Sequence, residues 1–211
     1  MAWQEKIVVI TGGASDLGQA VARFFAEQGA TVILADRARE ALEAARAAVG
    51  GRTFPALADM GDEAHVRQLF APLERVDVLV SCGGLLPTAP APIEETPADP
   101  LVAAVEAGVY GPYWAAKHAL PKMDDGSAII FIARGPAPYA SAQSMVGGAV
   151  TALMRAVAAE VEERGVRVNG VILGQGSEAD LRDDAVRAVA FLVEANHITG
   201  AAIAIGRAPQ S

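Results

Sequence analysis

Apolar residues fall along this chain in two alternating patterns. Short runs rich in valine and isoleucine are typical of strands buried on both faces. Between them lie alanine-rich segments with apolar positions at helical spacing, several of them preceded by an Asp or Ser that can cap a helix. The runs that predict strands are Ile7–Ile10, Thr31–Ala35, Val76–Val80, Ala128–Ile132, Val166–Leu173 and Ala201–Ile205. The segments that predict helices include Leu17–Gln28, Ala38–Val49, Glu63–Leu73 and Ser144–Glu163.

This alternation predicts an α/β fold, a doubly wound parallel sheet with helices on both faces. Such sheets bind ligands beyond the carboxyl ends of their strands, so we expect functional residues where the strands end. With 211 residues, 52% of them hydrophobic, the chain is expected to form one domain over residues 1–211. The proline-rich stretch Leu86–Pro100 is interpreted as a surface loop within that domain.

A glycine-rich loop, "TGGASDLG" from Thr11 to Gly18, lies between the first predicted strand and the first predicted helix. The unpaired N–H groups and the dipole of a helix start favour an anion there. Asp36 follows the second strand, where a carboxylate can accept both ribose hydroxyls of an adenosine. The combination indicates a dinucleotide site. The alternative is that the glycines allow only a tight turn and that Asp36 caps the next helix.

Five segments resemble the short-chain dehydrogenase/reductase family in order and spacing. They are "TGGASDLG", "ALADMGD", "SCGG", "GVRVNGVILG" and "HITGAAIAIG", and the resemblance extends over nearly the whole chain. It implies a Rossmann-type sheet of about seven strands. The stretch Ser81–Gly84 stands where the family has Asn-Asn-Ala-Gly and keeps only the final glycine.

The resemblance also implies a nicotinamide dinucleotide as cofactor. Asp36 favours NAD over NADP because a carboxylate repels a 2′-phosphate, although the adjacent Arg37 weakens that preference. The residues expected to bind the cofactor are Gly12, Ser15, Asp16, Leu17, Gly18, Asp36, Arg37, Asp59, Met60, Cys82, Gly83 and Gly84.

Asp16 stands where family members usually have glycine. Its carboxylate can cap the first turn of the helix instead of facing the phosphates. The alternative is that it occupies the anion site and repels a pyrophosphate. Cofactor affinity in an Asp16→Gly variant separates the two.

The family's reductases use a tyrosine as general acid, a lysine four residues later, a serine and an asparagine. An ungapped alignment back from "GVRVN" places Gln143 at the tyrosine position and Gly147 at the lysine position. Arg134 falls at the serine position and Gly108 at the asparagine position. Gln143 cannot supply a proton near neutral pH and Gly147 has no side chain to hold a ribose, so carbonyl reduction by this mechanism is not expected.

A second register makes Tyr139 the catalytic tyrosine and places Gln143 at the lysine position, but it needs an inserted helical turn. The catalytic candidates are therefore Tyr139, Arg134 and Gln143. In the functional interpretation, Arg134 lowers the pKa of Tyr139 or binds an anionic substrate. In the structural interpretation, it forms an ion pair, for example with Asp16.

Charge and composition exclude several function classes. The net charge is −8 and no basic run occurs, which disfavours nucleic acid and anionic membranes as partners. No apolar run has the length of a membrane span and no signal peptide is evident, so a cytoplasmic location is expected. The lone Cys82 and the scattered His65, His118 and His197 predict no metal site. Cys82 is expected to be a buried thiol rather than a nucleophile.

The segment after Gly174 is short, so the loop and helices that close over substrate in the family are nearly absent. The alanine- and glycine-rich helices around Trp114 and after Ser144 predict a homodimer or homotetramer built by helix packing.

Three functions stay open at this point. The first is a divergent NAD(H)-binding oxidoreductase-like member of the family without its standard proton-transfer groups, acting on an unknown small molecule. The second is a non-catalytic binding, scaffold or redox-sensing subunit that partners an active homologue. The third is non-redox chemistry on a bulky substrate.

Overall fold

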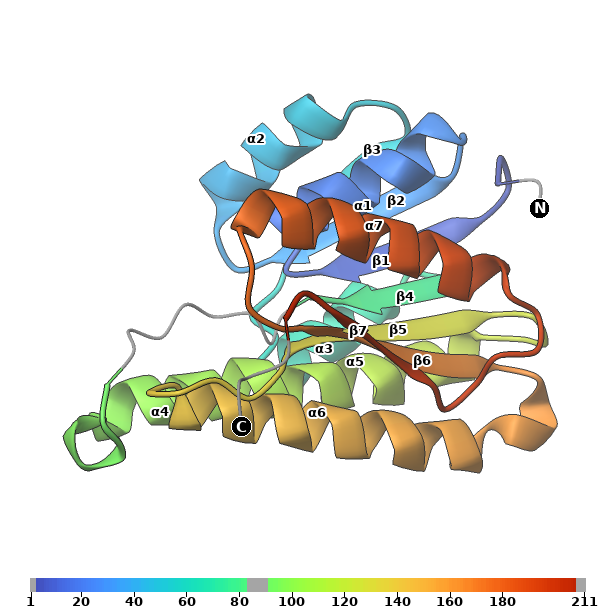
Figure 1. Ribbon diagram of the computed structural model, residues 1–211. Coiled ribbons are helices and arrows are strands. Elements are labelled where there is room, and N and C mark those ends of the chain that lie inside the picture. The colour runs from blue at the N-terminus through green and yellow to red at the C-terminus, as the bar shows by residue number, and fades with distance from the viewer. Residues whose placement is uncertain (1–2, 83–90, 208–211) are drawn as a thin grey trace.

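The computed structural model describes residues 3–82 and 91–207. Its centre is a parallel sheet with the strand order β3-β2-β1-β4-β5-β6-β7 (Figure 1). The order reverses between β1 and β4, the type of position where doubly wound folds bind their ligands. The strands are β1 (Ile7–Thr11), β2 (Thr31–Asp36), β3 (Thr53–Leu57), β4 (Val78–Ser81), β5 (Ala128–Arg134), β6 (Arg167–Leu173) and β7 (Ala202–Ile205).

Helices cover both faces of the sheet, as the alternating pattern predicted (Figure 1). One face packs against α1 (Asp16–Glu27), α2 (Arg39–Val49) and α7 (Glu178–Glu194). The other packs against α3 (Glu63–Phe70), α5 (Gly111–Ala119) and α6 (Ser141–Glu160). A short helix, α4 (Ala98–Val105), continues through a π-helical turn, Glu106–Tyr110, into α5.

The core consists of two apolar layers, one on each side of the sheet. Along β1, Val8 and Ile10 belong to the layer beneath α1 and α7, whereas Val9 belongs to the layer beneath α5 and α6. A strand covered on both faces needs apolar residues at every position, which is why its sequence is a continuous apolar run.

The strand β3 was not predicted from the apolar runs. It pairs only with β2, at the edge of the sheet, and contains Pro55. Phe54 and Leu57 are about half exposed, at 53% and 51%. An edge strand tolerates a proline and needs no continuous buried face, so it lacks the signal that marked the inner strands.

No helix in the described part of the chain has the length and apolarity required to span a membrane.

Candidate active site

The glycine loop folds tightly between β1 and α1. Gly12 has a φ of 67°, in the left-handed region that favours glycine. A side chain at Gly18 would place its Cβ 2.4 Å from the carbonyl oxygen of Gly12, so only glycine fits there. The Ser15 hydroxyl donates to that carbonyl over 2.7 Å and accepts from the Gly18 N–H over 3.1 Å. These contacts bring the loop backbone directly to the start of α1.

The start of α1 is capped by Ser15 and not by Asp16, which is the first helical residue. Asp16 is exposed, and its carboxylate makes no hydrogen bond or ion pair with the described residues. The N–H groups of a helix's first turn have no intrahelical acceptor. The loop therefore offers backbone donors to an anion, with the Asp16 carboxylate beside them.

Asp36 ends β2 and faces the glycine loop. Its Oδ2 accepts from the N–H of Ala14 over 3.2 Å and its Oδ1 accepts from the N–H of Arg37 over 2.8 Å. The first residue before α2 is Ala38, with no side-chain cap, so Asp36 does not cap that helix. Each carboxylate oxygen keeps a further lone pair that can accept a ribose hydroxyl. The loop and Asp36 thus fit the adenosine and pyrophosphate parts of a dinucleotide.

The remaining residues expected near the cofactor differ in their exposure to solvent. Asp59 is exposed, with its Oδ1 accepting from the Gly61 N–H over 2.9 Å, whereas Met60 is buried. Cys82 is only 2% exposed, and burial raises the pKa of its thiol to about 12. A thiol so protonated is a poor nucleophile. Gly83 and Gly84 lie outside the described residues.

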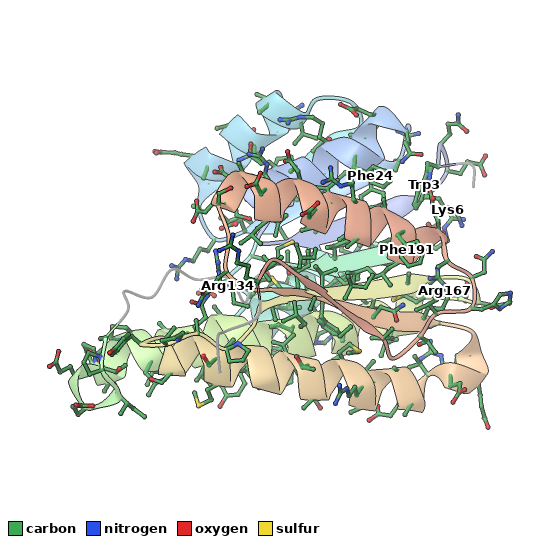
Figure 2. All side chains as sticks on the ribbon, in the orientation of Figure 1. Trp3, Lys6, Phe24, Arg134, Arg167 and Phe191 are labelled. Carbon is green, nitrogen blue, oxygen red and sulfur yellow. The ribbon has the colours of Figure 1, made fainter. Side chains whose placement is uncertain are left out.

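A cleft of about 630 Å³ opens at the carboxyl edge of the sheet. Its walls come from the glycine loop, the end of β5, the first turns of α6 and α7, and the loop after β6. The cleft brings together Leu17 and Asp16 with Arg134 and Gln143. Figure 2 shows Arg134 at this edge, opposite the edge that holds Arg167.

Tyr139 does not line this cleft with Arg134 and Gln143. Its side chain is 68% exposed, its φ is 57°, and its carbonyl oxygen accepts from the Ala91 N–H over 2.8 Å. The left-handed backbone at 139 lies just before α6 begins at Ser141. Two of the three catalytic candidates, Arg134 and Gln143, therefore line the same cleft, whereas Tyr139 lies at the surface.

The position aligned with the family's lysine is closed by backbone. Gly147 is buried in the second turn of α6, and a Cβ there would lie 1.9 Å from the carbonyl oxygen of Arg134. Any side chain at 147 collides with the end of β5. The sequence reveals that the lysine is absent, but only the packing reveals why a longer residue cannot stand there.

Arg134 is half-buried and has no carboxylate within 4 Å in the described part of the chain. The ion pair with Asp16 that the structural interpretation predicted is absent. Arg182, which also lines the cleft, is paired: its Nη2 lies 2.9 Å from Asp183 Oδ1.

The first turns of α7 form a wall of the cleft that sequence reasoning did not identify. Only residues 174–177 connect β6 to α7. Gln175 in this connection forms backbone hydrogen bonds with Arg207 in both directions, at 3.0 and 2.9 Å. The Ser177 hydroxyl caps α7, accepting from the Asp180 N–H. A serine followed by acidic residues was the available signal for this helix start.

The described residues contain no group of three or more His, Cys, Asp or Glu side chains close enough to hold a metal ion.

Comparisons with known proteins agree with this geometry. A sequence model of the family described as short chain dehydrogenase matches residues 6–188. The chain is 31% identical to cis-4-hydroxycyclohexanecarboxylate dehydrogenase of Sinomonas cyclohexanicum, over 97% of this chain and 96% of the relative. It is 32% identical to meso-2,3-butanediol dehydrogenase of Serratia marcescens, over 81% and 71% respectively.

Solved structures give the same result. A mutant of a Serratia marcescens short-chain dehydrogenase/reductase superposes with a TM-score of 0.85 at 26% identity, over 97% of this chain and 98% of that one. A short-chain dehydrogenase/reductase from Burkholderia xenovorans gives 0.84 at 28% identity, over 97% and 96%. With this fold, this glycine loop and these relatives, the chain belongs to the short-chain dehydrogenase/reductase family, a family of oxidoreductases.

Proposed function

We propose that this protein binds NAD(H) in the cleft and does not reduce carbonyls by the tyrosine–lysine mechanism of its relatives. The observation that carries the first half is the glycine loop held by Gly18 against Gly12, with the Asp36 carboxylate beside it. A bound nicotinamide would supply hydride transfer; the protein's own residues supply binding and orientation.

The preference for NAD rests on Asp36. Its carboxylate is fixed by two backbone N–H groups at the end of β2, so it cannot readily turn away from a 2′-phosphate placed on the adenosine ribose. Arg37, next to it, is the group that would moderate the repulsion.

The second half of the proposal rests on the residues at the reacting end of the cleft. Gln143 can donate and accept hydrogen bonds but holds no proton to transfer at neutral pH. The carbonyl of Arg134 occupies the space that a lysine stem at 147 would need. In this proposal, α6 supplies neither a general acid at position 143 nor a lysine at position 147.

A second candidate is a non-catalytic subunit that assembles with an active homologue. Three large side chains on neighbouring helices favour it, because each is about half exposed: Val102 on α4, Tyr113 on α5 and Met145 on α6, at 53%, 50% and 51%. Such surfaces are commonly covered by another subunit.

Calorimetric titration with NADH and NADPH at low salt tests the first candidate. We expect saturable binding of NADH, with NADPH at least about tenfold weaker because of like-charge repulsion. Asp36→Asn should weaken NADH binding and reduce the difference in affinity between NADH and NADPH. The control is Glu43→Gln, which removes an exposed carboxylate on α2 and should change neither the NADH nor the NADPH dissociation constant. Absence of binding at millimolar NADH would contradict the proposal and favour the assembly candidate.

Asp16 is tested in the same titration. Its exposed carboxylate lies beside the donors of α1, so Asp16→Asn should tighten NADH binding by roughly threefold to tenfold if it faces the pyrophosphate. Glu27→Gln, at the other end of α1, is the matched control. An unchanged constant in Asp16→Asn would show that the carboxylate does not oppose the cofactor.

Turnover is tested separately with NADH and two carbonyl compounds, 4-oxocyclohexanecarboxylate and acetoin, whose reduced forms correspond to the names of two relatives. We expect binding without tyrosine-dependent turnover, so any residual rate should be unchanged in Tyr139→Phe.

A further inference from the structure

One cation in the cleft, Arg134, forms no ion pair with the described residues. Arg134 projects from the end of β5 into the cleft, half-buried, with no carboxylate within 4 Å among residues 3–82 and 91–207. The chain as a whole has 25 acidic and 17 basic side chains. Since carboxylates are in excess, an unpaired guanidinium in a hollow is a feature to be explained.

The other charged groups of the cleft do not neutralise Arg134. Asp16 and Glu178 are exposed and lie in the first turns of α1 and α7, where helix dipoles favour a carboxylate. Arg182 is held by Asp183. Within the described residues, Arg134 is thus the cation of the cleft that has no protein counterion.

Arg134 is also separated from the place of a cofactor pyrophosphate. The glycine loop follows β1 and Arg134 ends β5, and β4 lies between these two strands in the sheet. Neighbouring strands are about 4.8 Å apart, so the two strand ends are about 10 Å from each other. Arg134 therefore enters the cleft from a strand end away from the phosphate loop, and Gln143 lines the same cleft.

The walls around Arg134 are mainly apolar. Leu17, Leu173 and Leu181 line the cleft and are themselves at most 8% exposed, and Pro136 and Pro138 form part of the rim. The volume of about 630 Å³ lies within the range of small-molecule sites. A mainly apolar cleft with a guanidinium and an amide in its lining suits a compact apolar body that carries one carboxylate.

We propose that Arg134 is the specificity residue of this cleft and that it binds the carboxylate of a small, largely apolar carboxylic acid. The planar guanidinium can form two parallel hydrogen bonds to a carboxylate, which a neutral amide cannot match. This inference rests on the proposed function, because it places the acid beside the dinucleotide. It names the ligand class that this site recognises.

The test is calorimetry with a matched pair of ligands, 4-oxocyclohexanecarboxylate and its neutral counterpart 4-oxocyclohexanecarboxamide, each with and without saturating NADH. We expect the carboxylate to bind at least tenfold more tightly than the carboxamide. Arg134→Gln should abolish that preference. Arg134→Lys should keep part of it, because lysine retains the positive charge but cannot form the two parallel hydrogen bonds of a guanidinium. Arg182→Gln, which removes a paired cation from the same cleft, should leave the preference intact.

The outcomes separate this inference from the proposed function. Equal binding of the two ligands, no binding of either, or a preference that survives in Arg134→Gln would overturn the role of Arg134. Loss of NADH affinity in Arg134→Gln, with the carboxylate preference unchanged, would mean that the guanidinium binds a cofactor phosphate. That result would also overturn the proposed role of Arg134. If wild-type protein fails to bind NADH but prefers the carboxylate, the cofactor proposal fails alone. The Arg134 side chain forms no ion pair with the described residues, and circular dichroism checks that each variant is folded.

Discussion

At the scale of single residues, two neighbouring glycines on α6 have opposite surroundings. Gly147 is buried against the carbonyl of Arg134, whereas a Cβ at Gly148 would meet nothing within 4 Å. Sequence comparison treats Gly147 only as a missing lysine. The packing adds that the end of β5 occupies the space of that side chain, so the loss is built into the backbone.

These two glycines give a prediction with an internal control. Gly147→Ala should lower the free energy of unfolding by about 2–3 kcal/mol, since β5 and α6 must separate to admit the methyl group. Gly148→Ala should raise it by about 0.5–1 kcal/mol, because alanine is the better helix former. Urea denaturation measures both. Equal effects in the two variants would contradict the contact, and recovery of carbonyl reduction in Gly147→Lys would contradict the closed lysine position.

Sequence positions at the ends of predicted strands indicated which residues lie near each other, while their role toward a cofactor stays a prediction. The glycine loop and the Asp36 carboxylate lie together as their spacing indicated. Features that depend on the detailed conformation of a loop were not predictable. The cap of α1 fell to Ser15, the expected Asp16–Arg134 ion pair did not form, and Tyr139 was placed outside the cleft by the left-handed turn before α6. Each of these depends on the path of a loop, which no periodicity specifies.

At the scale of elements, the inner strands and the helices α1, α2, α3 and α6 were predicted within a few residues, whereas no bounds were predicted for α7. The edge strand β3 was missed because its faces are half exposed. The helix α6 begins at Ser141, before the predicted Ser144, because its first turn lines the cleft and shows little apolar periodicity. Elements that face a site rather than the core lack the pattern by which elements are recognised.

One buried guanidinium binds the C-terminal end of α7. Arg167, at the start of β6, donates through Nη1 to the carbonyls of Leu192 and Ala195, at 2.6 and 2.9 Å, and through Nη2 to that of Val193 at 2.9 Å. These are carbonyls at the end of α7, which have no intrahelical donors. Burial lowers the pKa of Arg167, yet its cation suits the negative end of a helix dipole.

Removing that guanidinium should therefore destabilise the wall of the cleft from the opposite edge of the sheet. Arg167→Met should lower the free energy of unfolding by about 3 kcal/mol, because two buried carbonyls and a third, partly buried one lose their donor. Arg164→Met is the control: Arg164 also donates to two carbonyls, those of Leu120 and Met123, but at the surface, and should cost about 1 kcal/mol or less. Urea denaturation compares them. Similar decreases in the free energy of unfolding in both variants would show that burial does not make the Arg167 hydrogen bonds more stabilising than those of Arg164.

At the scale of the whole molecule, the two faces of the sheet differ in what they leave exposed. The helices α4, α5 and α6 lie together on one side (Figure 1). Val102, Tyr113 and Met145 on these helices are about half exposed, and Tyr113 packs edge-on against Trp114 with ring centroids 5.0 Å apart. Side chains of this kind are enriched where subunits meet. The predicted dimer or tetramer would use this side, and it would do so whether or not the cleft turns over a substrate.

Sedimentation velocity at micromolar concentration tests this expectation. We expect at least a dimer in the wild type, and dissociation in Tyr113→Glu and Met145→Lys, because a charge buried in an apolar contact is costly. Phe191→Lys is the matched control, since Phe191 is 54% exposed on α7, on the other side of the sheet. A monomeric wild type would refute the expectation, and dissociation only in Phe191→Lys would move the contact to α7. Because Tyr113 lies outside the cleft lining, its variant should keep the NADH affinity of the wild type; a parallel loss of that affinity would mean that assembly completes the cleft.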